Sequence, residues 1–260
     1  MTNVNGSKRE GVAVVTGASR GIGAAIAERF ASKGMAVACV ATSASNAAPI
    51  VEHIRTEFGV SGLAVGMQVQ DRDSVEAGMT LIENELGPIS ILVNNAGVSG
   101  VTTFLDMAVE DFDRVIDINL RGVFLCAQSA ARRMVASGTK GSIVNIGSIT
   151  GVNAFPKRMG YAASKAAVHH MTKVMALDLA EHGIRVNCVA PGYIRTDMIS
   201  DLIDAGSLDE GLLRKRIPLG ELGTPEDIAN AVDWISSGEA RYATGATMLI
   251  DGGWVAYGHV

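Results

Sequence analysis

Several features that would tie a chain to a particular compartment or partner are scarce in this sequence. It has three cysteines in 260 residues, and Cys39, Cys126 and Cys188 are too scattered to suggest a disulfide framework or a metal site. Free cysteines are usually small buried residues, so we expect all three inside the fold. A reducing, cytoplasmic setting follows from this cysteine usage.

Clusters of basic residues and of metal ligands are also missing. The formal net charge is −5 and no Lys or Arg cluster stands out, so nucleic acid is not an expected partner. The histidines show no ligand spacing with Asp, Glu or Cys, and we expect no metal. His169 and His170 are expected to face a helix packing or a subunit contact. The remaining histidines are His53, His182 and His259.

Long apolar runs of the kind that target or span a membrane are absent as well. Segment Met1–Glu10 is polar and lacks the apolar core of a secretory signal. The uncharged stretch Gly34–Val51 is interrupted by several polar residues and by Pro49, which favours a strand, a turn and a helix start. We therefore expect no membrane partner.

Apolar residues make up 48% of the chain, enough for the core of one large domain over residues 1–260. Short apolar runs alternate with helical patterns, and continuous apolarity predicts strands covered on both faces, as in a parallel sheet. The runs are Val12–Val15, Ala36–Val40, Leu63–Val69, Ile89–Val93, Ile143–Ile146, Ile184–Val189 and Thr247–Ile250. The helical patterns are Ile22–Lys33, Ala47–Phe58, Ser74–Leu86, Val109–Ala136, Tyr161–His182 and Pro225–Ser237. The predicted fold class is α/β: a single Rossmann-type doubly wound domain of about seven parallel strands with helices on both faces.

Two segments late in the chain have distinct local signals. Thr224, Pro225, Glu226 and Asp227 form a helix start, with an N-cap, a first-position proline and acids in the first turn. Residues 191–223 are rich in turn residues and charge, and we predict a substrate loop or lid there.

A glycine-rich turn follows the first predicted strand and opens a helix. Gly17, Gly21 and Gly23 permit positive φ and leave room for a phosphate, while the helix N-terminus offers free N–H groups. This context predicts a dinucleotide site, although the spacing differs from the common G-x-G-x-x-G. An ordinary glycine-rich turn is the alternative.

The end of the second predicted strand bears on the choice of cofactor. No Asp or Glu occurs from Met35 to Asn46 to hold a ribose 2′-hydroxyl, as an NAD site usually requires. Thr42 and Ser43, with Arg20 from the glycine turn, could accept a 2′-phosphate. We therefore predict NADP, with NAD as the alternative; a solvated surface charge is the other interpretation of Arg20.

Tyr161 and Lys165 are spaced i and i+4, so they share one face of a predicted helix. A phenol titrates near pH ~10, and a nearby ammonium favours its ionised form. The pair is therefore a candidate for transferring a hydroxyl proton, whereas the spacing alone also suits an ordinary amphipathic helix. Ser148 follows a strand and could donate to a substrate carbonyl, or serve only as a turn hydroxyl.

Taken together, these motifs resemble the short-chain dehydrogenase/reductase family over nearly the whole chain. The matching pieces are Thr16-Gly17-x-x-x-Gly21-x-Gly23, Asn94-Asn95-Ala96-Gly97, Asn119, Ser148, Tyr161-x-x-x-Lys165 and Pro191-Gly192. The resemblance implies that Asn119 holds a water on a proton relay from Lys165, and that the Ile194 backbone and the Thr196 hydroxyl meet the nicotinamide carboxamide. It also implies a dimer and commonly a homotetramer.

The expected catalytic residues are Asn119, Ser148, Tyr161 and Lys165. The expected cofactor-binding residues are Gly17, Ser19, Arg20, Gly21, Ile22, Gly23, Thr42, Ser43, Gln68, Val69, Asn95, Ala96, Gly97, Tyr161, Lys165, Pro191, Gly192, Ile194 and Thr196. At Gln68 the family often has Asp, which bonds the adenine amino group; the Gln amide oxygen can accept that bond.

Within the family the chain is most similar to the 3-oxoacyl-[acyl-carrier-protein] reductases, through 41–43 and 192–198. Those enzymes tend to dock an acidic carrier with basic residues on two helices; Arg132 and Arg133 could serve, but Leu177 stands at the second place. The resemblance implies an NAD(P)-dependent oxidoreductase that interconverts a ketone and a secondary alcohol, 3-oxoacyl-thioester reductase-like. The alternatives are a small carbonyl, sugar, polyol or cyclic alcohol as substrate, or a non-catalytic nucleotide-binding protein.

Overall fold

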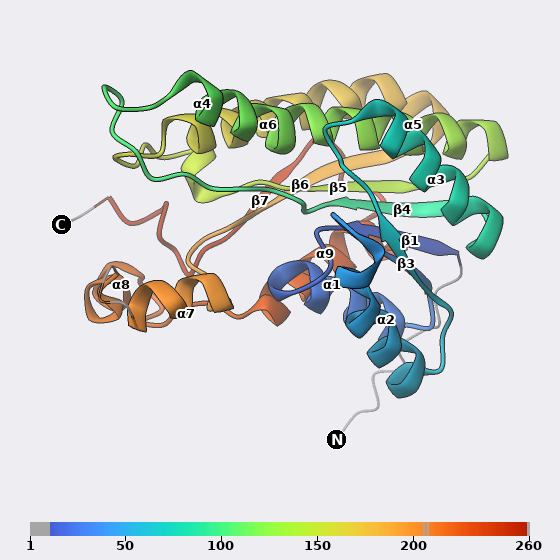
Figure 1. Cartoon of the computed structure of the whole chain (residues 1–260), viewed down its shortest axis with the longest axis horizontal. Coiled ribbons are helices and arrows are strands. Elements are labelled where there is room, and N and C mark those ends of the chain that lie inside the picture. The colour runs from blue at the N-terminus through green and yellow to red at the C-terminus, as the bar shows by residue number, and fades with distance from the viewer. Residues whose placement is uncertain (1–10, 205, 207, 259–260) are drawn as a thin grey trace.

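The computed structural model describes residues 11–204, 206 and 208–258, so the polar segment Met1–Glu10 and His259 lie outside the described residues. Its centre is a seven-stranded parallel sheet in the order β3-β2-β1-β4-β5-β6-β7 (Figure 1). The strands are β1 (Val12–Thr16), β2 (Ala36–Ala41), β3 (Gly62–Gly66), β4 (Ile89–Asn94), β5 (Ser142–Ile146), β6 (Arg185–Pro191) and β7 (Thr247–Ile250). The predicted parallel sheet is confirmed.

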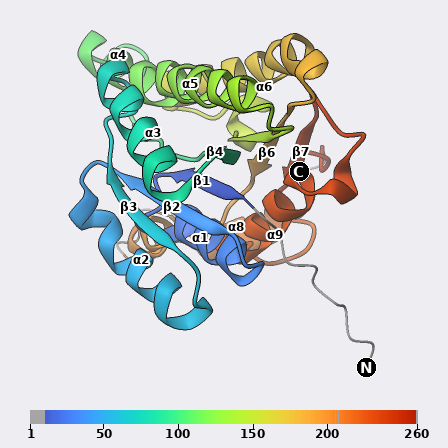
Figure 2. The same ribbon diagram turned by 90° about the vertical axis from the view of Figure 1, so that its right-hand side faces the viewer.

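Helices cover both faces of the sheet (Figures 1 and 2). The helices are α1 (Gly21–Ser32), α2 (Ala44–Phe58), α3 (Arg72–Leu86), α4 (Val109–Ile116), α5 (Gly122–Ser137), α6 (Met159–Leu179), α7 (Asp197–Asp204), α8 (Glu210–Arg216) and α9 (Pro225–Ser236). In Figure 1, α3 to α6 lie above the sheet, α1, α2 and α9 lie below it, and α7 and α8 lie off one end.

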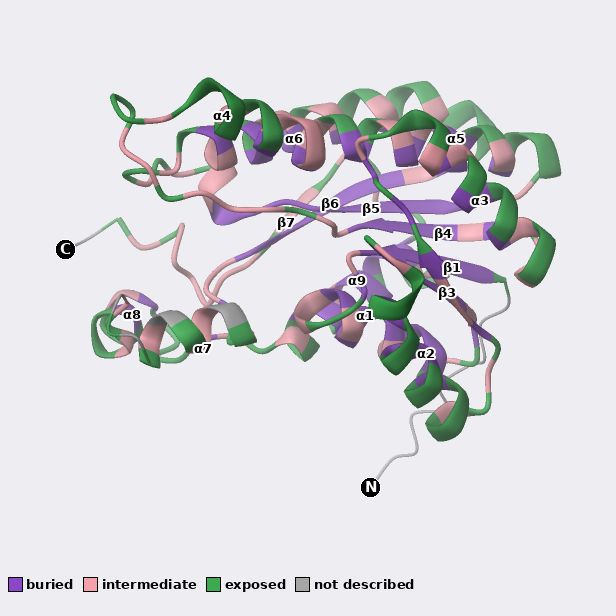
Figure 3. Cartoon of the chain, viewed as in Figure 1, coloured by how far each residue is buried: buried purple, intermediate pink, exposed green. Residues whose placement is uncertain are grey.

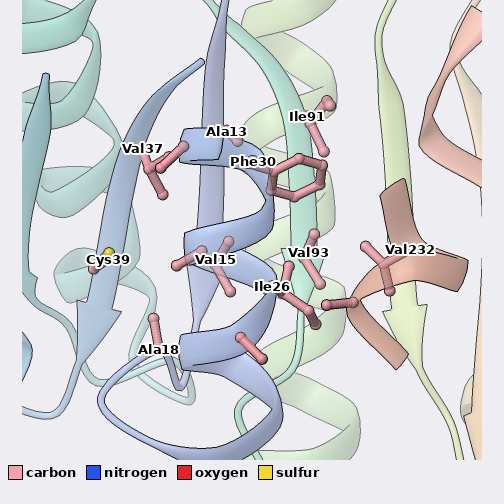
Figure 4. Close-up of a cluster of buried hydrophobic side chains, with 14 of the residues drawn as sticks. Ala13, Val15, Ala18, Ile26, Phe30, Val37, Cys39, Ile91, Val93 and Val232 are labelled. Carbon is pink, nitrogen blue, oxygen red and sulfur yellow. The ribbon is translucent and has the colours of Figure 1, made fainter. Parts of the chain in front are cut away.

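Two hydrophobic cores flank the sheet because successive strand residues point to opposite faces. Ala13 and Val15 pack under α1, where Figure 4 shows Ile26 and Phe30. Val12 and Val14 pack on the other side with residues of α3, α5 and α6. The central strands are therefore buried, and the outward helix faces are exposed (Figure 3).

Four local predictions can be compared with the structure. The helix start at Thr224 is confirmed, with a capping box between Thr224 and Asp227. The third strand ends at Gly66, because the backbone N–H of Gln68 instead bonds Ser74 Oγ at the start of α3. The single helix predicted over 109–136 is interrupted by a π-helical turn over 117–121. Segment 191–223, predicted to be irregular, contains α7 and α8.

The sheet order places a crevice at its centre. Strands β1 and β4 are neighbours although they are not consecutive, and the chain runs outward in opposite directions from them. Their carboxyl ends therefore border the switch point where doubly wound sheets bind ligands. Cys39, Cys126 and Cys188 are all buried and free, as predicted.

Candidate active site

A cavity of about 1240 Å³ opens at this switch point. It unites residues from both halves of the sheet, including the glycine turn after β1 and the start of α6. Of the predicted site residues, Ser43 and Asn119 do not line it. Those that line it are Gly17, Ser19, Arg20, Gly21, Ile22, Gly23, Thr42, Gln68, Val69, Asn95, Ala96, Gly97, Ser148, Tyr161, Lys165, Pro191, Gly192, Ile194 and Thr196.

The glycine turn leaves space that other residues would fill. Gly17 and Gly21 have φ of 65° and 55°, a region that favours glycine. A Cβ on Gly23 would lie 2.1 Å from the Gly17 carbonyl oxygen, so the turn can close onto α1 only without a side chain there. The backbone of this turn thus forms a cradle at a helix N-terminus, which fits the pyrophosphate of a nicotinamide dinucleotide.

Asn95 fixes the glycine turn to the end of β4. Its amide nitrogen donates to the carbonyl oxygens of Thr16 and Gly17, each at 3.0 Å. In return, Thr16 Oγ1 accepts from the backbone N–H groups of Asn95 and Ala96. The two strand ends that border the crevice are therefore held together by a closed set of hydrogen bonds.

The adenosine end of the cavity lies at the start of α2. Ser43 does not line the cavity, and its hydroxyl caps this helix by accepting from the Asn46 backbone N–H. Thr42 Oγ1 accepts from the Asn46 side-chain amide at 3.1 Å, so its own hydrogen remains available. Asn46 also lines the cavity, although no motif in the sequence points to it. Gln68 donates to the Thr42 carbonyl and keeps its amide oxygen for a ligand.

Arg20 reaches the same end from the glycine turn. Its backbone is extended at the N-cap of α1, and its side chain is exposed. None of the ion pairs among the described residues involves Arg20. This end of the cavity therefore offers a cation, a hydroxyl and an amide, and no carboxylate between Met35 and Asn46 opposes an anion.

Tyr161 and Lys165 lie one turn apart in α6. Lys165 is only 5% exposed, and its Nζ donates to the Ile146 carbonyl at 2.7 Å. The same Nζ lies 5.6 Å from the centre of the Tyr161 ring, within cation–π range. The end of β5 thus anchors the ammonium beside the phenol, and both side chains line the cavity.

Ser148 follows β5 and has its hydroxyl partly committed. Its Oγ accepts from the backbone N–H and the hydroxyl of Thr150, at 3.1 and 2.9 Å. A serine hydroxyl has one donor and two acceptor positions, so only the donor remains for a ligand. The group can therefore act on a substrate oxygen as a hydrogen-bond donor.

His169, from α6, contacts the backbone of Ser148. Its Nε2 accepts from the Ser148 backbone N–H at 3.4 Å, and a Cβ on Gly147 would lie only 2.3 Å from that nitrogen. Burial lowers the pKa of His169, and the charges of Lys165 and Lys173 lower it further. The ring is thus held neutral beside the end of β5, an environment that its place in the sequence did not reveal.

Asn119 lies in the π-helical turn and is fully buried. Its Oδ1 accepts from the Val98 backbone N–H, and its Nδ2 donates to the Val98 carbonyl and to Ser164 Oγ. The side chain therefore joins the segment after β4 to α6, with both of its polar atoms bonded within the protein. Single π turns often occur at functional sites because they shift the residues they contain.

The remaining wall comes from segments on which the sequence carried little signal. Thr196 lies against Gly21, where a Cβ on the glycine would be 3.4 Å from Thr196 Cγ2. Phe155, Arg158 and Tyr193 also line the cavity, from the segments before α6 and after β6. These side chains widen the site beyond the residues predicted from motifs.

Of Arg132 and Arg133, the two residues considered for carrier docking, one already forms ion pairs within the protein. Arg133 bonds the carboxylates of Glu76 and Glu83, whereas Arg132 is exposed. Leu177, at the second expected docking place, is 80% exposed.

In the described part of the chain, no helix is long and apolar enough to cross a membrane, and no three His, Cys, Asp or Glu side chains are grouped to hold a metal.

A family model described as Enoyl-(Acyl carrier protein) reductase matches residues 17–255. An uncharacterized short-chain type dehydrogenase/reductase of Sinorhizobium fredii, y4vI, is 40% identical over 94% of this chain, which spans 44% of that relative's length. The 3-oxoacyl-[acyl-carrier-protein] reductase FabG of Staphylococcus aureus is 41% identical, with 93% of this chain and 96% of the relative covered.

Solved structures are similar along the whole chain. A short-chain type dehydrogenase/reductase from Mycobacterium marinum superposes with a TM-score of 0.91 and 38% identity, covering 97% of this chain and 98% of that one. A gluconate 5-dehydrogenase from Burkholderia cenocepacia, in complex with NADP and tartrate, gives a TM-score of 0.90 and 33% identity over 96% of each chain.

Proposed function

The chain belongs to the short-chain dehydrogenase/reductase family, and on this premise we propose its catalytic residues, its preferred cofactor and its substrate class. It is an NAD(P)-dependent oxidoreductase that acts on CH–OH groups and interconverts a ketone and a secondary alcohol. A bound nicotinamide cofactor supplies or accepts the hydride. The remaining chemistry falls to the side chains of the cavity.

In the reduction direction, the Tyr161 hydroxyl gives its proton to the substrate oxygen, and in oxidation it takes the proton back. Ser148 donates a hydrogen bond to the same oxygen as negative charge develops there. The observation that carries this proposal is the state of the Ser148 hydroxyl, whose two acceptor positions are taken by Thr150 while its donor is free.

Lys165 holds the site together and resupplies the proton. One of its N–H donors is bonded to Ile146, and the others remain for the ribose hydroxyls. Because the Asn119 side chain is committed to Val98 and Ser164, we assign the contact with a relay water to its backbone. Asn119 is then a positioning residue whose side chain fixes the π-helical turn.

We assign NADP as the preferred cofactor. The support is the group of Arg20, Thr42 and Asn46 at the adenosine end, which presents positive charge and hydrogen-bond donors and has no nearby strand-end acid. A 2′-phosphate carries a charge of about −1.5 to −2 and accepts strong hydrogen bonds from arginine. The similar structure of a gluconate 5-dehydrogenase holds NADP, which supports this assignment.

Two substrate classes compete for the chemistry end. Similarity to FabG favours a 3-oxoacyl thioester. The commitment of Arg133 to two carboxylates argues against docking of a carrier protein at that place, and similarity to a gluconate 5-dehydrogenase favours a small carbonyl, sugar or polyol; a cyclic alcohol is a further alternative.

Three further assignments concern the lid, the assembly and the location of the protein. Segment 191–223 is the substrate lid, because its residues line the cavity at Tyr193, Ile199 and Asp201. We propose a homotetramer, in which the apolar side chains that α5 and α6 expose, Phe124, Val135, Val174 and Leu177, form subunit contacts. Light scattering of the purified protein would measure the assembly. A cytoplasmic location is consistent with three buried free cysteines.

Tyr161→Phe tests the proposed function, with Tyr242→Phe as the matched control because Tyr242 is 96% exposed. Turnover of acyl thioesters, diketones, sugars and cyclic ketones is measured with NADPH and NADH. We expect Tyr161→Phe to lower kcat by at least about 100-fold, the usual range for general acid–base catalysis, with an unchanged thermal midpoint. Equal activity of the two variants would remove Tyr161 from the mechanism.

A further inference from the structure

Arg158 is an arginine in the substrate half of the cavity that none of the proposed steps uses. It precedes Tyr161 by one helical turn at the start of α6, and it lines the same cavity as Tyr161 and Ser148. Its side chain is half-buried. A partly desolvated guanidinium beside a reaction centre is suited to bind a charged part of a substrate.

The guanidinium is bonded only to neutral groups. Its Nη1 donates to Ser99 Oγ at 2.6 Å and to the Gly100 carbonyl at 3.5 Å. No ion pair among the described residues includes Arg158. These contacts orient the side chain without neutralising its charge, and they leave donors for a further partner.

The backbone next to Arg158 is held in an unusual conformation. Lys157 has φ of 63° and is the one non-glycine residue with positive φ in the described part of the chain. Its carbonyl accepts from the Thr102 backbone N–H at 3.1 Å, which ties this turn to the segment that also bonds Arg158. Strain of this kind persists only where surrounding contacts enforce it, and it gathers at ligand sites.

Tyr193 lies within electrostatic reach of Arg158 across the cavity. Burial raises the pKa of Tyr193 while the Arg158 charge lowers it, with burial the larger cause. The phenol therefore remains a neutral donor that can join the guanidinium on one anion. Its ring packs on Trp254, with centroids 4.9 Å apart, and Trp254 stacks on Phe155 at 6.2 Å. Phe155 and Tyr193 thus present a rigid aromatic wall beside a cation.

Resting on the proposed function, we propose that Arg158 and Tyr193 bind the carboxylate of a small hydroxy acid or oxo acid substrate. The acidic end then lies one helical turn from Tyr161, with the reacting carbon between it and the cofactor. Asp197 and Asp201 line the same cavity, and their carboxylates would accept hydrogen bonds from hydroxyls on such a substrate. A neutral thioester would leave the guanidinium without a charged partner.

Arg158→Met tests this subsite, with Arg158→Lys keeping the charge without the planar fork. Arg241→Met is the matched control, because Arg241 is exposed and does not line this cavity. Short hydroxy acids and their methyl esters are compared as substrates. In wild type we expect the acid to have the higher kcat/KM. Arg158→Met should raise KM for the acid by about 10- to 100-fold with little change in kcat, and leave the ester unaffected.

A binding measurement keeps the test independent of turnover. Calorimetric titration with tartrate should give affinities about 10- to 100-fold weaker for Arg158→Met than for wild type and Arg241→Met. The subsite is refuted if Arg158→Met binds tartrate as tightly as wild type does. It is also refuted if this variant loses activity on the acid and on the ester to the same extent. Wild type that binds tartrate through Arg158 but turns over no carbonyl would instead refute the proposed function.

Discussion

Replacing Arg20 with Gln should change the cofactor preference more than the chemistry. Arg20 is exposed and lines the cavity together with Thr42 and Asn46, and no ion pair among the described residues involves it. A hydrogen bond from a charged group to an anion contributes about 1.5 to 3 kcal/mol, and every 1.4 kcal/mol is about tenfold in affinity. Since Arg20 is exposed and screened by solvent, the lower part of that range applies, about 10- to 30-fold.

The assay compares NADPH and NADH in two ways. Dissociation constants from nucleotide fluorescence report binding without catalysis, and kcat/KM reports the complete reaction. Arg20→Gln should weaken NADPH by the stated factor and leave NADH nearly unchanged, because NADH has no 2′-phosphate. Arg241→Gln is the control, since it removes an exposed positive charge that does not line the cavity. Raising the salt concentration should reduce the NADPH preference of wild type and have less effect on the variant.

A reciprocal change strengthens the test. Thr42→Asp places a carboxylate where an NAD site usually has one, so it should repel the 2′-phosphate and favour NADH. Two results would refute the reasoning: a wild type that prefers NADH, or an Arg20→Gln variant that weakens both nucleotides equally. The second result would indicate that Arg20 contacts a part of the nucleotide that NADPH and NADH share, and not the 2′-phosphate.

Three further outcomes are expected. Gly23→Ala places a Cβ 2.1 Å from a carbonyl oxygen of the turn, so it should destabilise the fold by about 1 to 3 kcal/mol and weaken cofactor binding. Gly238→Ala, which has open space around its Cβ, should have neither effect. Thermal melts measure the stability of the two variants, and nucleotide titration measures their cofactor binding. Burial lowers the pKa of His169 below its unfolded value, so below about pH 6.5 the unfolded state binds more protons than the folded state. The free energy of unfolding should therefore decrease as the pH is lowered, by at most about 1.4 kcal/mol per pH unit. In urea unfolding, His169→Gln should remove this pH dependence, and an unchanged dependence would assign it to other groups. Burial raises the pKa of the Cys39 and Cys126 thiols to about 12, so a thiol reagent should react with them only after unfolding, and fast reaction of the native protein would contradict their environment.

The sheet and the close packing of the glycine turn were predictable because their signals are local. A continuous apolar run such as 12–15 is typical of a buried parallel strand, and the spacing of Gly17 and Gly23 indicates a close approach of the backbone. Pairing of β1 with β4 then follows from the topology of doubly wound sheets. The parts predicted correctly are those in which neighbouring residues carry the information.

The parts that were not predicted depend on contacts between distant segments. The π-helical turn at Asn119 reflects its bonds to Val98 and Ser164, which no helical periodicity contains. His169 was expected at a helix or subunit contact and instead lies against the end of β5. Arg158 stands in a short irregular stretch before α6, where a single arginine is indistinguishable from a solvated one until the fold brings Ser99 to it.

The helices that follow β6 have a small apolar cluster of their own. Leu213, Ile217 and Leu222 form it, and Ile199 and Tyr193 pack against it, separate from the two large cores that flank the sheet. A segment with independent internal cohesion can be exchanged for another without disturbing the strands beneath it. Substrate selectivity should therefore change most readily through substitutions in this segment, with the cofactor-binding and catalytic residues left unchanged.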